Sequence, residues 1–264
     1  MKVGVLKIGS TTVSWLLAED LSRPLKRRQA VLNLIDRPDA ESILGMLVES
    51  WMDQTGPRAD MVLVGGGQAL RQHPEWVEHL GLASWILSGA EEGQVARIGI
   101  LAMAKHDAGM VIDIGGGSTE IVDDHRSFSL PVGVRRPISD QFSALSWPNK
   151  ASSSAATIVG GAGQAVARLL QRTDVDVIAT EELEQLRRSI QNRLPQWFEH
   201  HGIPADRISL VRPGIDILAA MLSHYHINRF YCSPYGLLEG LWLAASLGQG
   251  RPYPNARLDR FSPV

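Results

Sequence analysis

Short apolar runs interrupted by glycine-rich turns set the pattern of this chain. Two regions share one plan: residues 3–18 around a turn at residues 9–12, and residues 109–122 around a turn at residues 115–119. An apolar run, a tight glycine turn and a second apolar run predict a β-hairpin. Because the same plan occurs twice, far apart in the chain, we expect two related lobes.

A third glycine turn joins an apolar run to a segment with helical periodicity. Residues 156–159 precede the glycines of residues 160–163, and Val166, Leu169 and Leu170 then fall on one side of a predicted helix. A strand that enters a helix through glycines aims backbone N–H groups and the positive end of the helix at the turn. This arrangement suits an anion.

Alternating elements fill the rest of the chain. A buried strand is predicted over residues 60–64, ending at Gly65-Gly66-Gly67. Helices are predicted over residues 39–52, 91–105, 181–199, 216–226 and 235–246. The pattern indicates an α/β protein with a mixed sheet in each lobe. We place the lobes at residues 1–100 and 101–264, with the last helix packing back on the first lobe.

Composition narrows the class of protein. The chain has 264 residues, of which 44% are hydrophobic, so it can bury one large core or two smaller ones. A net charge of -2 provides no global positive field, so we expect neither nucleic acid nor a membrane as partner, and any anion must bind locally. Cys232 is the single cysteine, which excludes an internal disulfide and favours a buried thiol in a cytoplasmic protein. The sequence contains no run of about 20 apolar residues, the length that a helix needs to span a bilayer.

Several motifs resemble one enzyme family. The string Asp-Ile-Gly-Gly-Gly-Ser-Thr-Glu at residues 113–120, between apolar runs, is similar to the second phosphate motif of the exopolyphosphatase/guanosine pentaphosphate phosphatase (Ppx/GppA) family. Residues 86–92, 130–133, 211–218 and 233–240 resemble further signatures of this family. The order and approximate spacing agree from residue 60 to residue 245, so the resemblance covers most of the chain.

The resemblance implies a fold and a reaction. The fold is actin-like (ASKHA), with two ribonuclease-H-like domains, and the reaction removes a terminal phosphate from inorganic polyphosphate or guanosine pentaphosphate by attack of water. By the family pattern, Asp113 holds Mg²⁺ directly or through water, and Glu92 is the base for the attacking water. Glu120 helps to place the metal or the water, or is a solvated acid at a strand end. Homodimers in the family suggest a dimer by analogy.

Phosphate binding is predicted at the glycine turns and at basic side chains. Glycine lacks a Cβ atom, so successive N–H groups can converge on an anion. The predicted phosphate-binding residues are Lys7, Gly9, Ser10, Arg71, Gly115, Gly116, Gly117, Ser118, Gly161 and Gly163. Arg136 also matches a basic position of the family. For Arg71 and Arg136 a surface salt bridge is the alternative interpretation.

Residue 7 departs from the family pattern. Lys7 stands where the first phosphate motif has aspartate, so it binds phosphate as a point charge, repels Mg²⁺, or turns to solvent. Gly65-Gly66-Gly67 replaces hydroxyl side chains, and Leu238 replaces a common arginine. A second hypothesis is therefore a relative that binds a phosphorylated ligand or a partner protein without turnover. A third is a sugar or acetate kinase of the same superfamily, although no separate adenosine-pocket signature is present.

The histidine pairs do not indicate a metal site. His200-His201 and His224-x-His226 lack further ligands at zinc-like spacing, so we interpret them as partly exposed helix residues. The seven tryptophans are scattered and are interpreted as residues of the cores and of the lobe interface.

Overall fold

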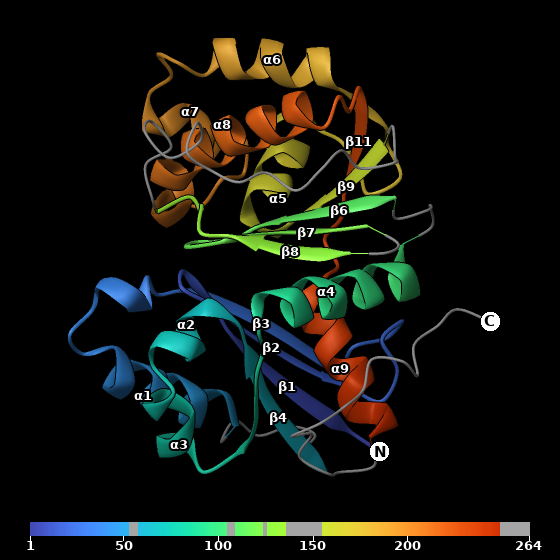
Figure 1. The fold of residues 1–264 in the computed structure, drawn as a ribbon. Helices are drawn as coiled ribbons and strands as arrows, with labels where there is room; N and C mark the ends of the chain where they lie inside the picture. Colours follow the sequence, from blue (N-terminus) through green and yellow to red (C-terminus); the bar gives the residue numbers. More distant parts are fainter. Residues whose placement is uncertain (53–57, 105–108, 124–125, 136–154, 249–264) are drawn as a thin grey trace. The chain divides into compact units, whose positions relative to one another are not determined.

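The chain forms two compact units, each built on its own sheet (Figure 1). The computed structural model describes residues 1–52, 58–104, 109–123, 126–135 and 155–248. The first unit is Met1–Ser88 with the segment that begins at Leu237, and the second is Gly89–Gly236. The two units divide between Ser88 and Gly89, before the predicted helix of residues 91–105. The sequence pattern predicted this boundary near residue 100. The final helix groups with the first unit.

The first unit contains a five-stranded mixed sheet with the order β3-β2-β1-β4-β5. Its strands are β1 (Val3–Ile8), β2 (Thr12–Ala18), β3 (Lys26–Val31), β4 (Met61–Gly66) and β5 (Ala83–Ile86). Its helices are α1 (Ala40–Met52), α2 (Gln68–Gln72), α3 (Glu75–Leu80) and α9 (Leu237–Leu247), with a 3-10 turn at Leu34–Asp36. Strand β2 runs antiparallel to β1 and β3, and β4 runs parallel to β1 and β5. The predicted first hairpin is confirmed.

Alternation along β1 divides this unit into two layers. Leu6 and Ile8 join a core that includes Leu44 of α1 and Trp76 of α3. On the other face lies α9, whose Trp242 donates its indole N–H to the carbonyl oxygens of Val3 and Ala18 at 3.1 and 3.3 Å. A strand with both faces buried reads as a nearly continuous apolar run, as residues 3–8 do.

The second unit repeats the plan. Its strands are β6 (Met110–Ile114), β7 (Thr119–Val122), β8 (Ser127–Leu130), β9 (Ala155–Val159), β10 (Ile178–Ala179) and β11 (Arg229–Cys232), in the order β10-β11-β9-β6-β7-β8. Strands β6, β7 and β8 form an antiparallel meander, and β9 and β11 extend the sheet in parallel from β6. This is the order of the first sheet with one short strand added. The predicted fold of two ribonuclease-H-like domains with mixed sheets is confirmed.

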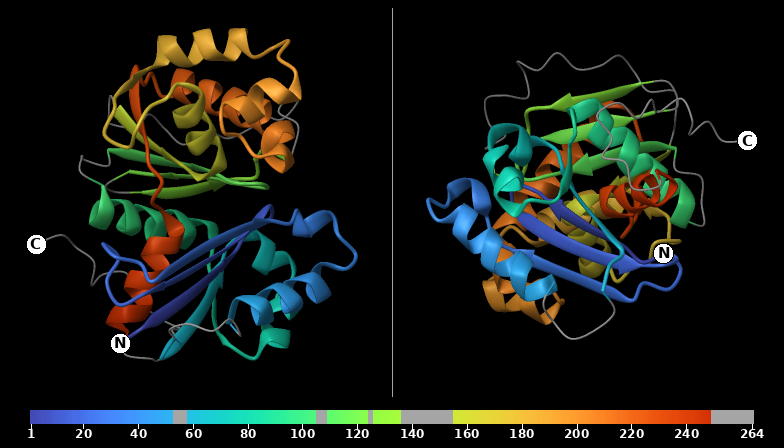
Figure 2. Two further views of the ribbon diagram at one scale, coloured as in Figure 1. Left: turned by 180° about the vertical axis from the view of Figure 1, so that it is seen from behind. Right: turned by 90° about the horizontal axis from the view of Figure 1, so that it is seen from below.

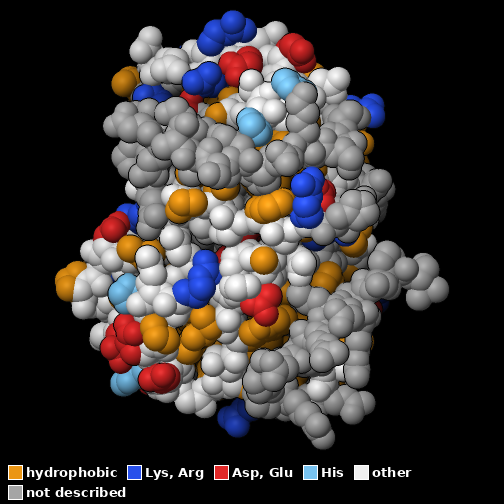
Figure 3. All heavy atoms as spheres, in the orientation of Figure 1, with side chains coloured by type: hydrophobic (Ala, Val, Ile, Leu, Met, Phe, Trp, Pro, Cys, Tyr) orange, Lys and Arg blue, Asp and Glu red, His pale blue; other side chains and the backbone are white. Residues whose placement is uncertain are grey.

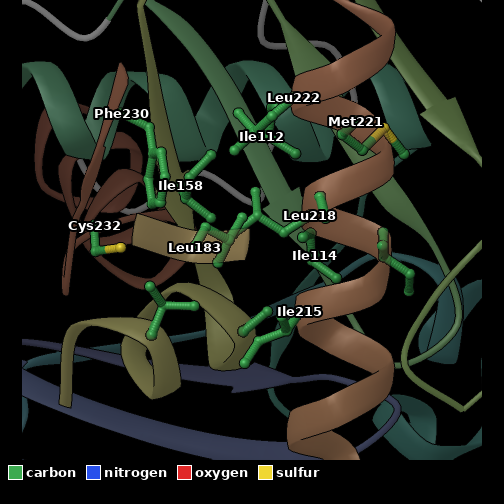
Figure 4. Packing of buried hydrophobic residues seen from close by; sticks show 14 of the residues in the cluster. Ile112, Ile114, Ile158, Leu183, Ile215, Leu218, Met221, Leu222, Phe230 and Cys232 are labelled. Carbon is green, nitrogen blue, oxygen red and sulfur yellow. The ribbon is translucent and has the colours of Figure 1, made fainter. Parts of the chain in front are cut away.

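Helices cover both faces of the second sheet. They are α4 (Gly89–Met103), α5 (Gly160–Leu169), α6 (Thr180–Ser189), α7 (Pro195–His200) and α8 (Ile208–His224), with a 3-10 turn at Ala205–Arg207. Figures 1 and 2 show α4 on one face and α5 and α8 on the other. On the α5 and α8 side, Ile112, Ile158 and Leu218 belong to one large apolar cluster (Figure 4). Cys232 lies in that cluster as a buried free thiol, as predicted, and burial raises its pKa to about 12.

Two helix predictions were wrong in extent. The helix predicted over residues 181–199 is two helices, because Pro195 occupies a first-turn position, where its missing N–H favours a new start. Helix α8 begins at Ile208 instead of residue 216 and contains Pro213. Pro213 is the sixth residue of α8 and cannot donate to the Ser209 carbonyl oxygen, so the helix continues across one missing hydrogen bond.

The surface carries charges of both signs. Figure 3 shows basic and acidic side chains interspersed on one face of the molecule, in keeping with the net charge of -2. Within the part of the chain that the structure describes, no helix combines the length and the apolar character that crossing a bilayer requires.

Candidate functional site

A row of polar side chains crosses three strands of the second sheet. Asp113 on β6 pairs with Glu120 on β7, and Glu120 pairs with Ser129 on β8. Residues directly opposite on antiparallel strands point to the same face, with Cβ atoms about 4.5–5.5 Å apart. Asp113 is 7% exposed and Glu120 is 2% exposed. Two carboxyl groups are therefore buried side by side on one face of the sheet, where β6 and β7 join the second glycine turn.

Helix α4 packs closely over this row. A Cβ atom on Gly89 would lie 2.2 Å from the Ser129 Cβ, and one on Gly93 would lie 2.5 Å from a methyl group of Val122. The Ser127 hydroxyl also donates to the Ala90 carbonyl oxygen at 2.8 Å. Only glycine permits this approach, which brings the first turn of α4, and with it Glu92, to the carboxyl row.

The pKa of Glu120 is strongly affected by its neighbours in the row. Burial raises its pKa well above the ordinary value, and the nearby carboxylates of Glu92 and Asp113 raise it further. Hydrogen bonds from Ser129 and Ser118 act in the opposite direction; the Ser129 hydroxyl donates to Glu120 Oε1 at 2.8 Å. The alternative of a solvated acid at a strand end does not describe Glu120, because its side chain is buried among polar and charged groups.

The turn between β6 and β7 is held by its own backbone and by the segment after β8. The Gly115 N–H donates to the Ser118 carbonyl oxygen at 2.9 Å. The N–H groups of Val134 and Arg135 donate to the carbonyl oxygens of Gly115 and Gly116 at 3.0 and 2.9 Å. Within the described residues, the N–H groups of residues 116–118 form no backbone hydrogen bond. The Gly115 N–H is thus used by the turn itself, whereas these three donors are not used by the backbone of the described residues.

The third glycine turn is the first turn of α5. Gly160 has a φ of 81°, and a Cβ atom there would lie 2.7 Å from Asp113 Oδ1 and 2.8 Å from the Ile114 carbonyl oxygen. A Cβ atom on Gly163 would lie 2.9 Å from the Ile158 carbonyl oxygen, so Gly163 lets α5 pack against β9. A Cβ atom on Gly161 would lie 3.2 Å from Arg207 Nη1. The start of α5 therefore lies beside Asp113 and beside a guanidinium group that we did not predict.

The remaining predicted residues lie in the first unit, at the ends of β1 and β4. Lys7 is half-buried on β1, opposite Ser14 on β2 and beside Gly65 on β4. The Gly9 N–H donates to the Thr12 carbonyl oxygen at 2.9 Å and closes the turn, in which Ser10 is buried. Arg71 donates to the Leu87 carbonyl oxygen, so that guanidinium group braces the end of β5.

Two side-chain oxygens beside the first turn are buried and have no hydrogen-bond partner among the described residues. They are Thr11 Oγ1 and Asn33 Oδ1. Their backbones are joined, because the Leu32 and Asn33 N–H groups both donate to the Thr11 carbonyl oxygen. Of the two side chains, only the Thr11 hydroxyl could donate a hydrogen bond to an anion, because the Asn33 amide oxygen is an acceptor.

Gly66 explains part of the glycine run after β4. A Cβ atom there would lie 2.2 Å from the Ile8 carbonyl oxygen, and one on Gly65 would lie 2.7 Å from a methyl group of Leu241. Glycine at residue 66 is therefore required by the packing of β4 against β1, and a hydroxyl side chain does not fit there. At residue 65 the neighbour is the end of the Leu241 side chain of α9, which can move to admit a small side chain.

Within the described residues, no group of three histidine, cysteine, aspartate or glutamate side chains is arranged to hold a metal ion. The histidine pairs serve other contacts: the His201 ring lies 4.0 Å from the Trp197 ring, and His224 lies edge-on to Tyr225. Arg136 lies outside the described residues. Ser129 was not predicted, because a lone serine in a short alternating segment carries no signal of its own.

Comparison with known proteins finds one family whose model matches the segment that contains the carboxyl row. Residues 75–150 match the model of the Ppx/GppA phosphatase family, and this segment contains Glu92, Asp113 and Glu120. The predicted resemblance to the Ppx/GppA family is confirmed.

Solved structures with the same fold cover nearly the whole chain. A Ppx/GppA family member from Aquifex aeolicus is 17% identical, with a TM-score of 0.74 over 95% of this chain and 99% of that one. An exopolyphosphatase from Cytophaga hutchinsonii is 14% identical, with a TM-score of 0.70 over 95% and 99% of the two chains. An exopolyphosphatase-like protein is 15% identical, with a TM-score of 0.75 over 94% and 100%.

The raised pKa of Glu120 predicts how stability depends on pH. A carboxyl group whose pKa is raised by folding stabilises the folded state fully below its unfolded pKa, and this contribution is lost as the pH rises through the folded pKa. We therefore expect Glu120→Gln to raise the free energy of unfolding above about pH 5, and the gain to grow as the pH rises toward 8. The melting temperature should rise by about 2–4 °C for each kcal/mol. Thermal unfolding of both proteins at pH 4.5 and pH 8 checks this, and an equal or lower melting temperature of the variant at pH 8 contradicts it.

Proposed function

We propose that this protein is a phosphohydrolase that removes the terminal phosphate from inorganic polyphosphate or guanosine pentaphosphate by attack of water. The observation that carries the proposal is the convergence of Glu92, Asp113 and Glu120 beside the second glycine turn, inside the segment that matches the phosphatase family model. Among the described residues, the N–H groups of residues 116–118 in that turn have no backbone acceptor. Attack of water on a phosphoryl group requires an acid that can accept the proton of the water, next to hydrogen-bond donors that bind the phosphate oxygens. The named activity of the Cytophaga hutchinsonii relative agrees with it.

The second glycine turn is suited to the transferred phosphoryl group. The N–H groups of residues 116–118 point at no backbone acceptor of the described chain, and preformed donors of this kind lower the energy of charge that develops in a transition state. The tight fit of Gly133 against Gly116, and the hydrogen bonds from the Val134 and Arg135 N–H groups, hold the turn in place. The turn is therefore preorganised. Positioning and electrostatic stabilisation by preorganised groups supply most of the rate acceleration in phosphoryl transfer.

The carboxyl row is also the place where Mg²⁺ would bind. Mg²⁺ in phosphoryl-transfer sites is held by one or two carboxylates together with water and substrate phosphates, so three protein ligands are not required. We assign Asp113, which lies beside Gly160 at the start of α5, as the ligand of Mg²⁺. Glu120 on the next strand would help to position the ion. When bound, the ion neutralises phosphate oxygens that would otherwise be repelled by the carboxylates.

Glu92 is assigned as the general base. It lies in the first turn of α4, near enough to Glu120 to raise the pKa of that acid. Glu92 accepts a proton from water as the water oxygen bonds to the terminal phosphorus. The bond from that phosphorus to the bridging oxygen breaks, its electron pair leaves with the shortened phosphate chain, and orthophosphate is released. The proton on Glu92 then returns to solvent.

Phosphate release from purified protein tests the proposal. Long-chain polyphosphate and guanosine pentaphosphate are each supplied with Mg²⁺, and orthophosphate is measured against time. We expect release from at least one of the two substrates, and none after the metal is chelated. If the wild-type protein releases orthophosphate no faster than the Glu92→Gln variant does, the proposal is wrong.

Lys7 favours a second candidate function, in which the chain binds a phosphorylated ligand without turnover. It is half-buried at the end of β1, where the family motif has an acid, and an ammonium group there disfavours a metal cation. A bound ligand would raise the melting temperature by mass action without any release of phosphate.

Replacement of Lys7 separates two roles of this residue, repulsion of Mg²⁺ and binding of phosphate. If the protein turns over slowly because Lys7 repels Mg²⁺, Lys7→Asp should raise the Mg²⁺-dependent rate about tenfold or more, since two charge units change at one site. If Lys7 instead binds phosphate in the working enzyme, the variant should raise KM. Rates at several Mg²⁺ concentrations decide between these results. Lys2→Asp, the same charge change at a half-buried lysine just before β1, is the matched control.

A further inference from the structure

Two serines of β8 lie under two glycines of α4. Ser127 and Ser129 are two residues apart on the strand, so their side chains point to the same face of the sheet. A Cβ atom on Gly89 would lie 2.2 Å from the Ser129 Cβ, and one on Gly93 would lie 2.8 Å from the Ser127 Oγ. The first residue of α4 thus packs on one serine, and the fifth residue packs on the other.

The spacing of these two contacts matches on both elements. Four residues of a helix rise about 6 Å, and two residues of a strand extend about 6.8 Å. The Ser127 hydroxyl adds a hydrogen bond to the Ala90 carbonyl oxygen at 2.8 Å. Two contacts at matched spacing, together with this hydrogen bond, fix where the first turn of α4 lies along β8.

The position of this turn determines the position of Glu92. Glu92 lies between Gly89 and Gly93 in the sequence, and it is close enough to Glu120 to affect the pKa of that acid. The turn cannot slide along β8 without losing the contacts of both glycines. Strand β8 is therefore the element that sets how far the assigned base lies from the carboxyl row.

Ser129 has a second contact, which fixes the other acid. Its hydroxyl donates to Glu120 Oε1 at 2.8 Å, and Ser118 in the second glycine turn makes a hydrogen bond to the same carboxyl group. Hydrogen bonds to a carboxylate are shorter and stronger than those between neutral groups. The Glu120 side chain is thus held both by the edge strand β8 and by the turn.

We propose that Ser127 and Ser129 are positioning residues that hold Glu92 and Glu120 at the separation that hydrolysis requires. The proposal rests on the proposed function, because the separation matters only if the two acids act on the water and the metal. Neither serine is assigned a contact with substrate. Ser127 acts by anchoring the helix turn that carries Glu92, and Ser129 acts by orienting the carboxylate of Glu120.

Steady-state kinetics with long-chain polyphosphate and with guanosine pentaphosphate test this assignment. The variants are Ser129→Ala, Ser129→Thr, Ser127→Ala and the matched control Ser189→Ala. Ser189 is an exposed serine at the end of α6, and its hydroxyl donates to the Leu186 carbonyl oxygen at 2.8 Å. The control therefore removes one serine hydroxyl and one hydrogen bond of the same length, away from the carboxyl row.

The expected losses fall on kcat. Displaced acids slow the chemical step and leave phosphate binding intact, so Ser129→Ala should lower kcat about tenfold or more and change KM less than about threefold. Ser127→Ala should have a smaller effect of the same kind. Ser129→Thr keeps the hydroxyl group and should recover kcat to within about threefold of wild type. Ser189→Ala should leave both constants unchanged.

Thermal unfolding tests the contact between Ser129 and Glu120 without any assay of activity. Ser129→Ala should lower the melting temperature of the wild-type chain by about 2–4 °C, the shift expected for the loss of one hydrogen bond. In the Glu120→Ala variant the serine has lost its acceptor. The same substitution should therefore lower the melting temperature of that variant by less than about 1 °C.

Three results would overturn the assignment. The first is a kcat of Ser129→Ala equal to that of Ser189→Ala. The second is a raised KM with an unchanged kcat, which would mean that Ser129 binds substrate directly. The third is an equal shift of the melting temperature in the wild-type and Glu120→Ala backgrounds, which would mean that Ser129 does not hold Glu120.

Failure of the proposed function gives a different result. If the wild-type protein releases no orthophosphate, hydrolysis is rejected, and the melting temperatures alone decide whether Ser129 holds Glu120. If orthophosphate is released at a rate that does not respond to Ser129→Ala, the enzyme stands and the positioning role of the serines is rejected.

Discussion

Glu92→Gln is expected to lower orthophosphate release by about 10²–10⁴-fold, the range that removal of a positioned general base produces. Glutamine keeps the shape of the side chain and its packing in the first turn of α4, but its amide cannot accept the proton of the attacking water. The loss should appear in kcat, because the base acts on the water and not on the bound phosphate chain. Steady-state rates with polyphosphate and Mg²⁺ provide the measurement.

Glu91→Gln is the matched control for this variant. Glu91 occupies the preceding position in the same helix turn, so both substitutions remove one negative charge at the helix start, where acids are favoured by the dipole. We expect Glu91→Gln to keep the rate within about threefold. Equal losses in the two variants would mean that the charge of the helix start matters and that neither acid is the base.

Gly160→Ala should both destabilise the protein and impair the site. Alanine at a φ of 81° costs about 1–2 kcal/mol, and a Cβ atom 2.7 Å from Asp113 Oδ1 adds about 1–3 kcal/mol of overpacking. Because the clash falls on Asp113 itself, the carboxylate must move. A displacement of about 1 Å in a reacting site can cost 10²-fold in rate. Chemical denaturation and the rate of phosphate release measure the two effects.

Gly202→Ala isolates the backbone contribution. Gly202 has a similar φ of 76°, and a Cβ atom there would meet nothing within 4 Å. This control should lose only the backbone term, about 1–2 kcal/mol, and keep its activity. If Gly160→Ala is no less stable than Gly202→Ala and equally active, the contact between Gly160 and Asp113 does not matter for the site.

Sequence patterns predicted the sheets well where both faces of a strand are buried. Residues 3–8 and 109–114 are mostly apolar runs next to glycine turns, each interrupted by one charged residue, and both form central strands. Strand β3 was missed because it is an edge strand with the sequence Lys-Arg-Arg-Gln-Ala-Val, in which no apolar alternation marks it. The break before Pro195 was missed because the apolar periodicity continues across it.

The candidate site was predicted unevenly. The family motifs identified Glu92, Asp113 and Glu120, and the strand register accounts for why the last two lie side by side. The burial that raises the pKa of Glu120 depends on Gly89 and Gly93 of α4, whose close packing no local pattern reveals. Arg207 reaches the start of α5 from a distant turn, so its position required the fold. The magnesium ion, the homodimer and the cytoplasmic location stay predictions.

Hydrolysis in ¹⁸O-labelled water tests the central claim most directly. Purified protein is incubated with polyphosphate and Mg²⁺ in labelled water, and the released orthophosphate is analysed by mass. Attack of water on the terminal phosphorus predicts one solvent oxygen in each orthophosphate released in the first turnovers. Absence of orthophosphate, or orthophosphate that carries no label, would contradict the account.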